Sequence, residues 1–211
     1  MTLVEQILFI GKGVFVTLQY TLAALTIGVS LGVTLAIVRL SLLRWLIDSF
    51  VSLLRGTPLL LQLSFFYFAL PGLLDVRLDI WQAGFIAFGL NSAAYVTEIF
   101  RSGIQSIPKA QFEAAKSLRI NNFLLWKDII MPQVFRNIFP ALINEVISLI
   151  KETAIISVFG ELDITRRSQV IAASNFSYFV PVCIAGVYYY SLVFIIERLA
   201  NKIEKLLHAK Y

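Results

Sequence analysis

Residues 13–38 read GVFVTLQYTLAALTIGVSLGVTLAIV, a stretch without a single Asp, Glu, Lys, Arg or His. A helix needs about 20 mostly apolar residues to cross a bilayer, so this stretch is long enough to span one. It also contains Gly28-Val-Ser-Leu-Gly32, a G-x-x-x-G spacing whose small residues let another helix approach closely. The stretch therefore predicts a transmembrane helix that packs tightly on its glycine face, either within the chain or between two chains.

The composition of the whole chain agrees with a membrane protein. Of its 211 residues, 58% are hydrophobic and 15% are charged, and the mean hydropathy is +0.80. Soluble domains average about 45–50% apolar and about 25% charged residues. This composition excludes a water-soluble globule and a disordered chain, and it gives no sign of a partner nucleic acid.

Three more stretches lack charged residues and histidine, at 56–74, 80–97 and 168–196. They predict spans at about 56–74, 80–100 and 176–196, the start of the last stretch being a short surface segment. A fifth span is expected at 133–150, although this segment holds Arg136, Asn137, Asn144 and Glu145. The chain is thus expected to be one all-helical transmembrane domain over residues 1–211.

The distribution of basic residues supports five spans. With the N-terminus outside, only Lys12, Arg77, Lys151, Arg166 and Arg167 fall in outer segments, and the other 13 of the 18 Lys and Arg residues fall inside. Positive charge in short loops marks the cytoplasmic side. An arrangement with four spans leaves more of the basic residues on the outer side. We therefore expect five spans, with the N-terminus outside and the C-terminus in the cytoplasm.

The fifth expected span is polar on two neighbouring faces. Asn137, Asn144 and Lys151 recur every seven residues, and Glu145 and Glu152 share a face about 100° away. Polar groups in a span face the bundle interior or a watery cavity. Two interpretations follow: these residues hold helices together by hydrogen bonds, or they line a pathway, which the two acids favour.

Several function classes are excluded by residues that the chain lacks. It has one cysteine, Cys183, and one histidine, His208 near the C-terminus, so it offers no disulfide and no predicted metal site. It lacks the G-x-x-x-x-G-K-[ST] loop of nucleotide hydrolases. No catalytic residue is predicted. A channel or an assembly subunit remains as an alternative to a transporter, but a channel has no need for the long inner loop.

That loop, residues 101–132, is too polar to span and too long for a simple turn. It predicts two short helices, with a break at Asn121–Asn122 and an end before Pro132. The first helix carries Ala110, Ala114 and Leu118 at a spacing of four. A face made mostly of alanine binds lipid weakly, so docking against another protein fits better than lying on the bilayer.

Within this loop, Glu113-Ala114-Ala115, followed by Ile129 and Pro132, resembles the EAA signature of ABC-importer permease subunits. That signature has a glycine four residues after its second alanine, where this chain has Arg119. The glycine of the family implies a left-handed turn between the two loop helices. In this chain we expect the Asn121–Asn122 pair to make that turn instead.

The resemblance extends over nearly the whole chain. RGTPLL at 55–60, SAAYVTEIFR at 92–101 and KET at 151–153 resemble the polar amino acid branch of the family, the histidine, glutamine and arginine permeases. It implies a type I ABC-importer permease that imports a polar, glutamine-like amino acid across the bacterial inner (plasma) membrane. A second permease subunit, identical or a sister chain, would complete the pathway. Cytoplasmic ATPase subunits would bind ATP, and an extracytoplasmic binding protein would deliver the amino acid.

The resemblance also implies roles for single residues. The coupling loop that contacts the ATPase would include Glu113, Ala114, Ala115, Arg119, Ile129 and Pro132. Ionisable groups inside a membrane are functional by default, and charges of both signs complement a zwitterion. For Glu98 and Arg101, a structural ion pair at the (i, i+3) spacing is the alternative. The substrate-pathway candidates are Glu98, Arg101, Asn144, Glu145, Lys151 and Glu152.

Overall fold

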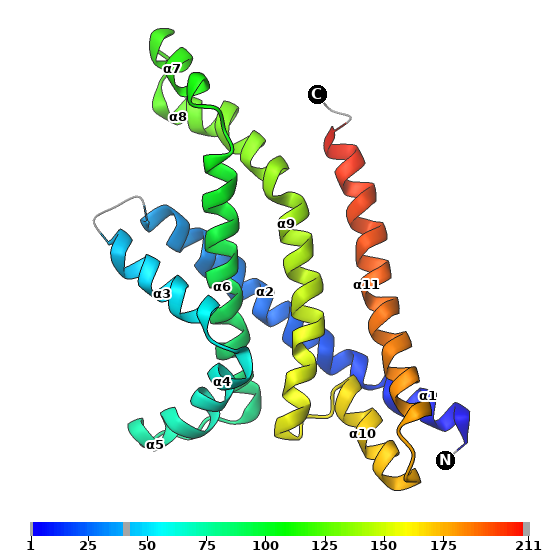
Figure 1. The fold of residues 1–211 in the computed structure, drawn as a ribbon. Coiled ribbons are helices and arrows are strands. Elements are labelled where there is room, and N and C mark those ends of the chain that lie inside the picture. The colour runs from blue at the N-terminus through cyan, green and yellow to red at the C-terminus, as the bar shows by residue number, and fades with distance from the viewer. Residues whose placement is uncertain (1, 40–42, 209–211) are drawn as a thin grey trace.

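The computed structural model describes residues 2–39 and 43–208, with the side chains of residues 207 and 208 left out. Within these ranges helices joined by short turns make up the chain, and there is no strand (Figure 1). The helices are α1 (Leu3–Gly11), α2 (Gly13–Val38), α3 (Arg44–Gly56), α4 (Leu59–Ser64), η1 (Phe65–Ala69), α5 (Leu70–Leu74), α6 (Ile80–Gln105), α7 (Lys109–Ser117), α8 (Asn122–Leu124), η2 (Leu125–Ile130), α9 (Met131–Glu152), η3 (Thr153–Phe159), α10 (Ile164–Asn175) and α11 (Phe179–His208).

Three helical segments of the described chain are long and apolar enough to cross a membrane. They are 3–38, formed by α1 and α2 together, then α6 and most of α11. A fourth span is possible if the bent pair of α3 and α4–α5 crosses as one unit. The helix α9 covers the fifth expected span but is too polar to meet the same test, so its insertion stays a prediction.

Figure 1 shows how the ends of the chain are arranged. The loop that carries α7 and α8 lies at the same end of the molecule as the C-terminal end of α11, and the N-terminus and α10 lie at the opposite end. This arrangement is compatible with an odd number of spans. Which end is cytoplasmic stays a prediction from the charges.

The core is built along α6, which α2 crosses in the same direction. At one end Tyr20 is fully buried and stacks on Trp81 with ring centroids 4.5 Å apart. Further along, Thr97 Oγ1 donates to the backbone carbonyl of Gly32 at 3.1 Å. The G-x-x-x-G spacing is therefore used inside this chain, because Gly28 and Gly32 bring the backbone of α2 against α6.

The expected span at 56–74 does not form one straight helix. The helix α3 ends at Gly56, Thr57 and Pro58 are extended, and the chain restarts in α4 after a bend of 103°. The buried side-chain amide of Gln62 donates to the carbonyl of Leu54 at 2.7 Å and to that of Thr57 at 3.1 Å. Carbonyls freed by the break are thus satisfied by one side chain.

The expectation that Pro132 ends the second loop helix is wrong. The helical path runs from Asn122 through η2 into α9 without interruption. The wider turns of the π-helix η2, which lies directly before Pro132, shift the hydrogen-bond register. A proline that lacks an N–H and crowds the carbonyl four residues back is therefore tolerated there. Pro71 follows the π-helix η1 in the same way.

Candidate functional site

The candidate coupling residues lie in the loop that projects from one end of the bundle (Figure 1). Glu113 and Ala114 are exposed on α7, whereas Ala115 is buried in a cluster with Leu125 and Ile130. Ile129 and Pro132 are half-buried beside this cluster. This cluster continues into α2, α6 and α9 through Ala36, Phe100 and Val134, so the loop packs onto the core of the bundle and presents Glu113 and Ala114 on the outside.

The turn between the two loop helices is not where we expected it. Arg119 itself adopts the left-handed conformation, with φ of 54°. Asn121 is extended, and its side chain caps the next helix by accepting from the N–H of Phe123 at 2.8 Å. The expected transfer of the turn to the asparagine pair is therefore wrong. The geometry that glycine adopts freely is kept at position 119 at a cost of roughly 1–2 kcal/mol.

A pair of glutamines joins the coupling helix to the membrane core. The amide of Gln111 on α7 donates to Gln133 on α9 at 3.0 Å, and the amide of Gln133 donates back at 2.8 Å. Gln133 also donates to the carbonyl of Ile129 at 2.7 Å. Both side chains are partly buried, so this reciprocal pair of hydrogen bonds fixes the direction of α7 relative to α9. The sequence pattern did not reveal this contact, because the two glutamines lie in different helices.

Of the acids on α9, Glu145 is buried and faces α6. Ser92 Oγ donates to its carboxyl at 2.8 Å, a bond that joins two helices. For Glu145 the structure therefore agrees with the interpretation that polar groups hold helices together. Glu152 is half-buried at the end of α9, and Lys151 beside it is exposed.

The asparagines expected on one face of α9 have different surroundings. Asn137 donates to Ser106 Oγ at 2.8 Å on the side of α6. Asn144 lines a shallow cleft against α11, together with Glu197 and Asn201. The predicted polar face is thus divided between two neighbouring helices.

Glu98 and Arg101 belong to a network of ion pairs. Glu98 binds Arg101 on the same helix and Arg39 of α2 at 2.9 Å, and Arg39 also pairs with Asp48 of α3. Three helices are thereby joined at the end near the coupling loop. The (i, i+3) ion pair weighed from the sequence is present, and Arg101 is held in it.

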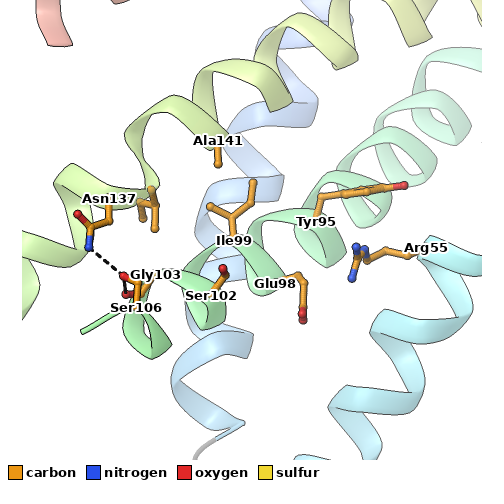
Figure 2. Close-up of a pocket in the computed structure, with 10 residues that line it drawn as sticks. Arg55, Tyr95, Glu98, Ile99, Ser102, Gly103, Ser106, Asn137 and Ala141 are labelled. Carbon is orange, nitrogen blue, oxygen red and sulfur yellow. Dashed lines mark hydrogen bonds between the residues drawn. The ribbon is translucent and has the colours of Figure 1, made fainter. Parts of the chain in front are cut away.

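Beside this network lies a cleft of about 260 Å³ between the end of α3, α6 and α9. Figure 2 shows Arg55 and Tyr95 on one side of it, Asn137 and Ser106 on the other, and Ser102 and Glu98 between them. The Arg55 guanidinium lies over the Tyr95 ring, 5.1 Å from its centre. Arg55, Tyr95 and Ser102 are not among the site candidates predicted from the sequence, although the strings that contain Arg55 and Tyr95 carry the family resemblance.

At the opposite end of the molecule, Asp163 fixes α10 against α11. Its carboxyl is fully buried, caps α10 by accepting from the N–H of Arg166 at 2.7 Å, and accepts from Tyr189 at 3.1 Å. Burial raises the pKa of Asp163 above its ordinary value, and these hydrogen bonds act against the rise. Burial also raises the pKa of nearby Glu161, helped by the charges of Asp163 and Asp79.

Comparison with known proteins places this arrangement in a family. Residues 28–208 match the model of binding-protein-dependent transport system inner membrane components. The chain belongs to this family. It is a permease component of the ABC-transporter type, and the expected family and fold class are confirmed.

Individual relatives of this permease component cover almost its full length. A protein named as a glutamine transport system permease, GlnP of Rickettsia bellii, is 48% identical over 205 residues, which are 96% of this chain and 94% of the relative. The arginine transport system permease protein ArtQ of Bacillus subtilis is 42% identical, over 97% of this chain and 94% of the relative.

Solved structures share the fold of the permease component. The crystal structure of an amino acid ABC transporter with histidines matches with a TM-score of 0.90 and 35% identity, covering 97% of this chain and 99% of that chain. The methionine ABC transporter MetNI in an inward-facing conformation matches with a TM-score of 0.75 at 16% identity, over 94% of this chain and 96% of that one. The latter likeness shows the fold alone.

Proposed function

We propose that this permease component imports a polar amino acid, with glutamine as the first candidate, across the bacterial inner (plasma) membrane. An extracytoplasmic binding protein delivers the amino acid, and separate cytoplasmic ATPase subunits supply the energy. The chain itself is not an enzyme, since its sequence carries no phosphate-binding loop for ATP. Two permease subunits, identical or sister chains, form the pathway, with each N-terminus outside.

The observation that carries this proposal is the projecting loop. It is compact, it exposes Glu113 and Ala114, and it is bonded to α9 through Gln111 and Gln133. A loop of this kind suits the transfer of motion from a partner protein into the membrane core. Relatives named for glutamine and arginine transport support an amino acid as the substrate.

Reconstituted transport tests the function as a whole. Proteoliposomes would contain this chain with its ATPase and binding protein, and ATP-dependent uptake of a panel of labelled amino acids would be measured. We expect uptake of one polar amino acid. Uptake of none by a fully assembled complex would contradict an amino acid as the substrate.

For the substrate pathway we propose the end of α9 opposite the coupling loop. Glu152 is half-buried there, and Lys151 is exposed beside it, so the two provide charges of both signs at adjacent positions. A zwitterionic amino acid presents an ammonium and a carboxylate that complement such charges. Asn144 and Glu145 lie one to two turns further along α9 toward the loop.

Glu152→Gln is expected to weaken uptake of the amino acid about tenfold, through a higher KM and not through loss of assembly. The substitution keeps the shape of the side chain and removes one charge from a half-buried position. Initial uptake rates over a range of substrate concentrations measure the effect. Asp75→Asn is the matched control, because Asp75 is exposed, with φ of 52°, and asparagine tolerates this conformation. Wild-type KM values for Glu152→Gln would remove Glu152 from the pathway.

Gln133→Leu is expected to raise the ATP consumed per amino acid imported several-fold. It leaves the amide of Gln111 without its partner and loosens α7 from α9. The cost is at most about 1–3 kcal/mol, because both side chains are only partly buried. The double variant Gln111→Leu with Gln133→Leu replaces both amides by an apolar pair and should recover part of the coupling. ATP hydrolysis and uptake measured together give the ratio. An unchanged ratio in the single variant would show that the glutamine pair has no role in coupling.

A further inference from the structure

The cleft of Figure 2 contains a charge that the protein does not neutralise. Arg55 lies on its wall with its guanidinium over Tyr95. Among the described residues, no carboxylate lies within ion-pair distance of Arg55. Arg55 is exposed in the last turn of α3, and the planar fork of a guanidinium fits a carboxylate with two parallel bonds.

The neighbouring acids do not neutralise the charge of Arg55. Glu98 also lines the cleft, but its two oxygens already accept from Arg101 and Arg39. Asp48 pairs with Arg39 and Arg44. The acids around the cleft are thus engaged by other arginines, and the local charge is positive. The cleft favours a ligand that carries a carboxylate.

The remaining groups on the wall suit the rest of an amino acid. The hydroxyl of Ser102 and the side-chain oxygen of Asn137 make no hydrogen bond with another described residue. Ile99, Ile138 and Ala141 provide an apolar surface between them. Drug-sized ligands occupy pockets of about 300–1,000 Å³, so a cleft of about 260 Å³ is matched to a smaller molecule.

We propose that this cleft is a second amino acid-binding site, on the coupling-loop side of the permease and separate from the α9 end that carries Glu152. The carboxylate binds Arg55, and a polar side chain reaches Ser102 and Asn137. The identity of the ligand rests on the proposed function. Because Ser106 and Asn137 join the root of the coupling loop to α9 at the edge of the cleft, occupancy is sensitive to the position of that loop.

A cysteine-protection experiment tests the site without any transport. The complete complex with its ATPase is placed in phosphatidylcholine nanodiscs, with Cys183→Ser as background and Ser102→Cys as the reporter in the cleft. The rate of maleimide labelling is measured with increasing L-glutamine. We expect saturable slowing of at least about threefold with Arg55 present, none with Arg55→Gln, and none for a Ser174→Cys reporter on the surface of α10 at the opposite end of the molecule.

Two controls separate the amino acid from other anions. Ethanolamine, which lacks a carboxylate, should not protect the reporter. Nanodiscs containing phosphatidylglycerol test whether a lipid phosphate binds Arg55 instead. Labelling that depends on phosphatidylglycerol and not on glutamine would overturn the proposal. Absence of protection by glutamine, or equal protection in Arg55→Gln, would overturn it as well.

The outcome is independent of the proposed import activity. Glutamine protection of the cleft without glutamine uptake would refute the proposed function and leave the site standing. Uptake without protection would refute the site alone.

Discussion

Replacing Glu113 by lysine is expected to abolish ATP-driven uptake and to leave the protein folded in the membrane. Glu113 is exposed on α7, so the fold does not depend on it. A partner surface that is complementary to the carboxylate of Glu113 faces an ammonium in the variant. A like-charge contact at an interface costs several kcal/mol. Each 1.4 kcal/mol is a factor of about ten in affinity, so uptake should fall more than about tenfold.

The measurement compares uptake, ATPase recruitment and melting temperature in the same reconstituted preparation. Asp128→Lys is the matched control, because it makes the same charge reversal at another exposed acid of the loop. We expect it to affect uptake far less. Full uptake by Glu113→Lys would show that this face of the loop does not couple to the ATPase.

Replacing Gly28 by leucine is expected to destabilise the permease by about 2–6 kcal/mol. A Cβ at Gly28 would lie 2.7 Å from Cβ of Ser92, so α2 and α6 would have to separate. Overpacking of this kind costs about 1–3 kcal/mol. Ser92 also donates to the buried carboxyl of Glu145, and losing that bond adds about 1–3 kcal/mol.

Thermal unfolding in detergent measures this loss of stability, with the monodisperse fraction of the protein as the readout. Gly186→Leu is the control, because a Cβ at Gly186 meets no atom within 4 Å. It should melt as the wild type does. If Gly28→Leu kept the wild-type melting temperature and changed only the association of two chains, the glycine face would serve a contact between subunits.

Much of the fold follows from where charges are missing. The uncharged stretches predicted α2 over its full length, the larger part of α6 and the first part of α11, because an apolar helix can be recognised by hydrophobicity alone. The charged ends of α6 and α11 extend beyond these stretches. At 56–74 the same signal missed the break at Thr57 and Pro58, which lies inside this uncharged stretch. The amide of Gln62 satisfies the bend by donating to the carbonyls of Leu54 and Thr57, a contact of which hydrophobicity gives no sign.

The loop shows a different limit. The signature residues lie in a projecting loop, as expected, and its coupling role stays a prediction. The rule that proline ends a helix failed at Pro132, because the π-turn that accommodates it leaves no mark in the sequence. The left-handed turn at Arg119 was also missed. Asparagine adopts the left-handed conformation more readily than arginine, so the sequence favoured Asn121 and Asn122, whereas the folded chain places the turn at Arg119.

The candidate site was only partly accessible to sequence reasoning. Glu145 and Glu98 stood out because charges in spans are rare, and both prove to be bonded to neighbouring helices. Arg55 and Asn137 line one cleft although they are far apart in the sequence. Such convergence depends on how α3, α6 and α9 cross, which no local pattern records.

The uninterrupted path from Asn122 to Glu152 has a mechanical consequence. At a rise of about 1.5 Å per residue this path is about 45 Å long along its axis, and Figure 1 shows it change direction between the loop end and α9. Pro140 adds a second point at which the helix can bend. We expect a tilt imposed at the loop end to reach Glu152 at the far end to the extent that these bends keep their angles, so that both ends of the permease move together without a separate signal between them.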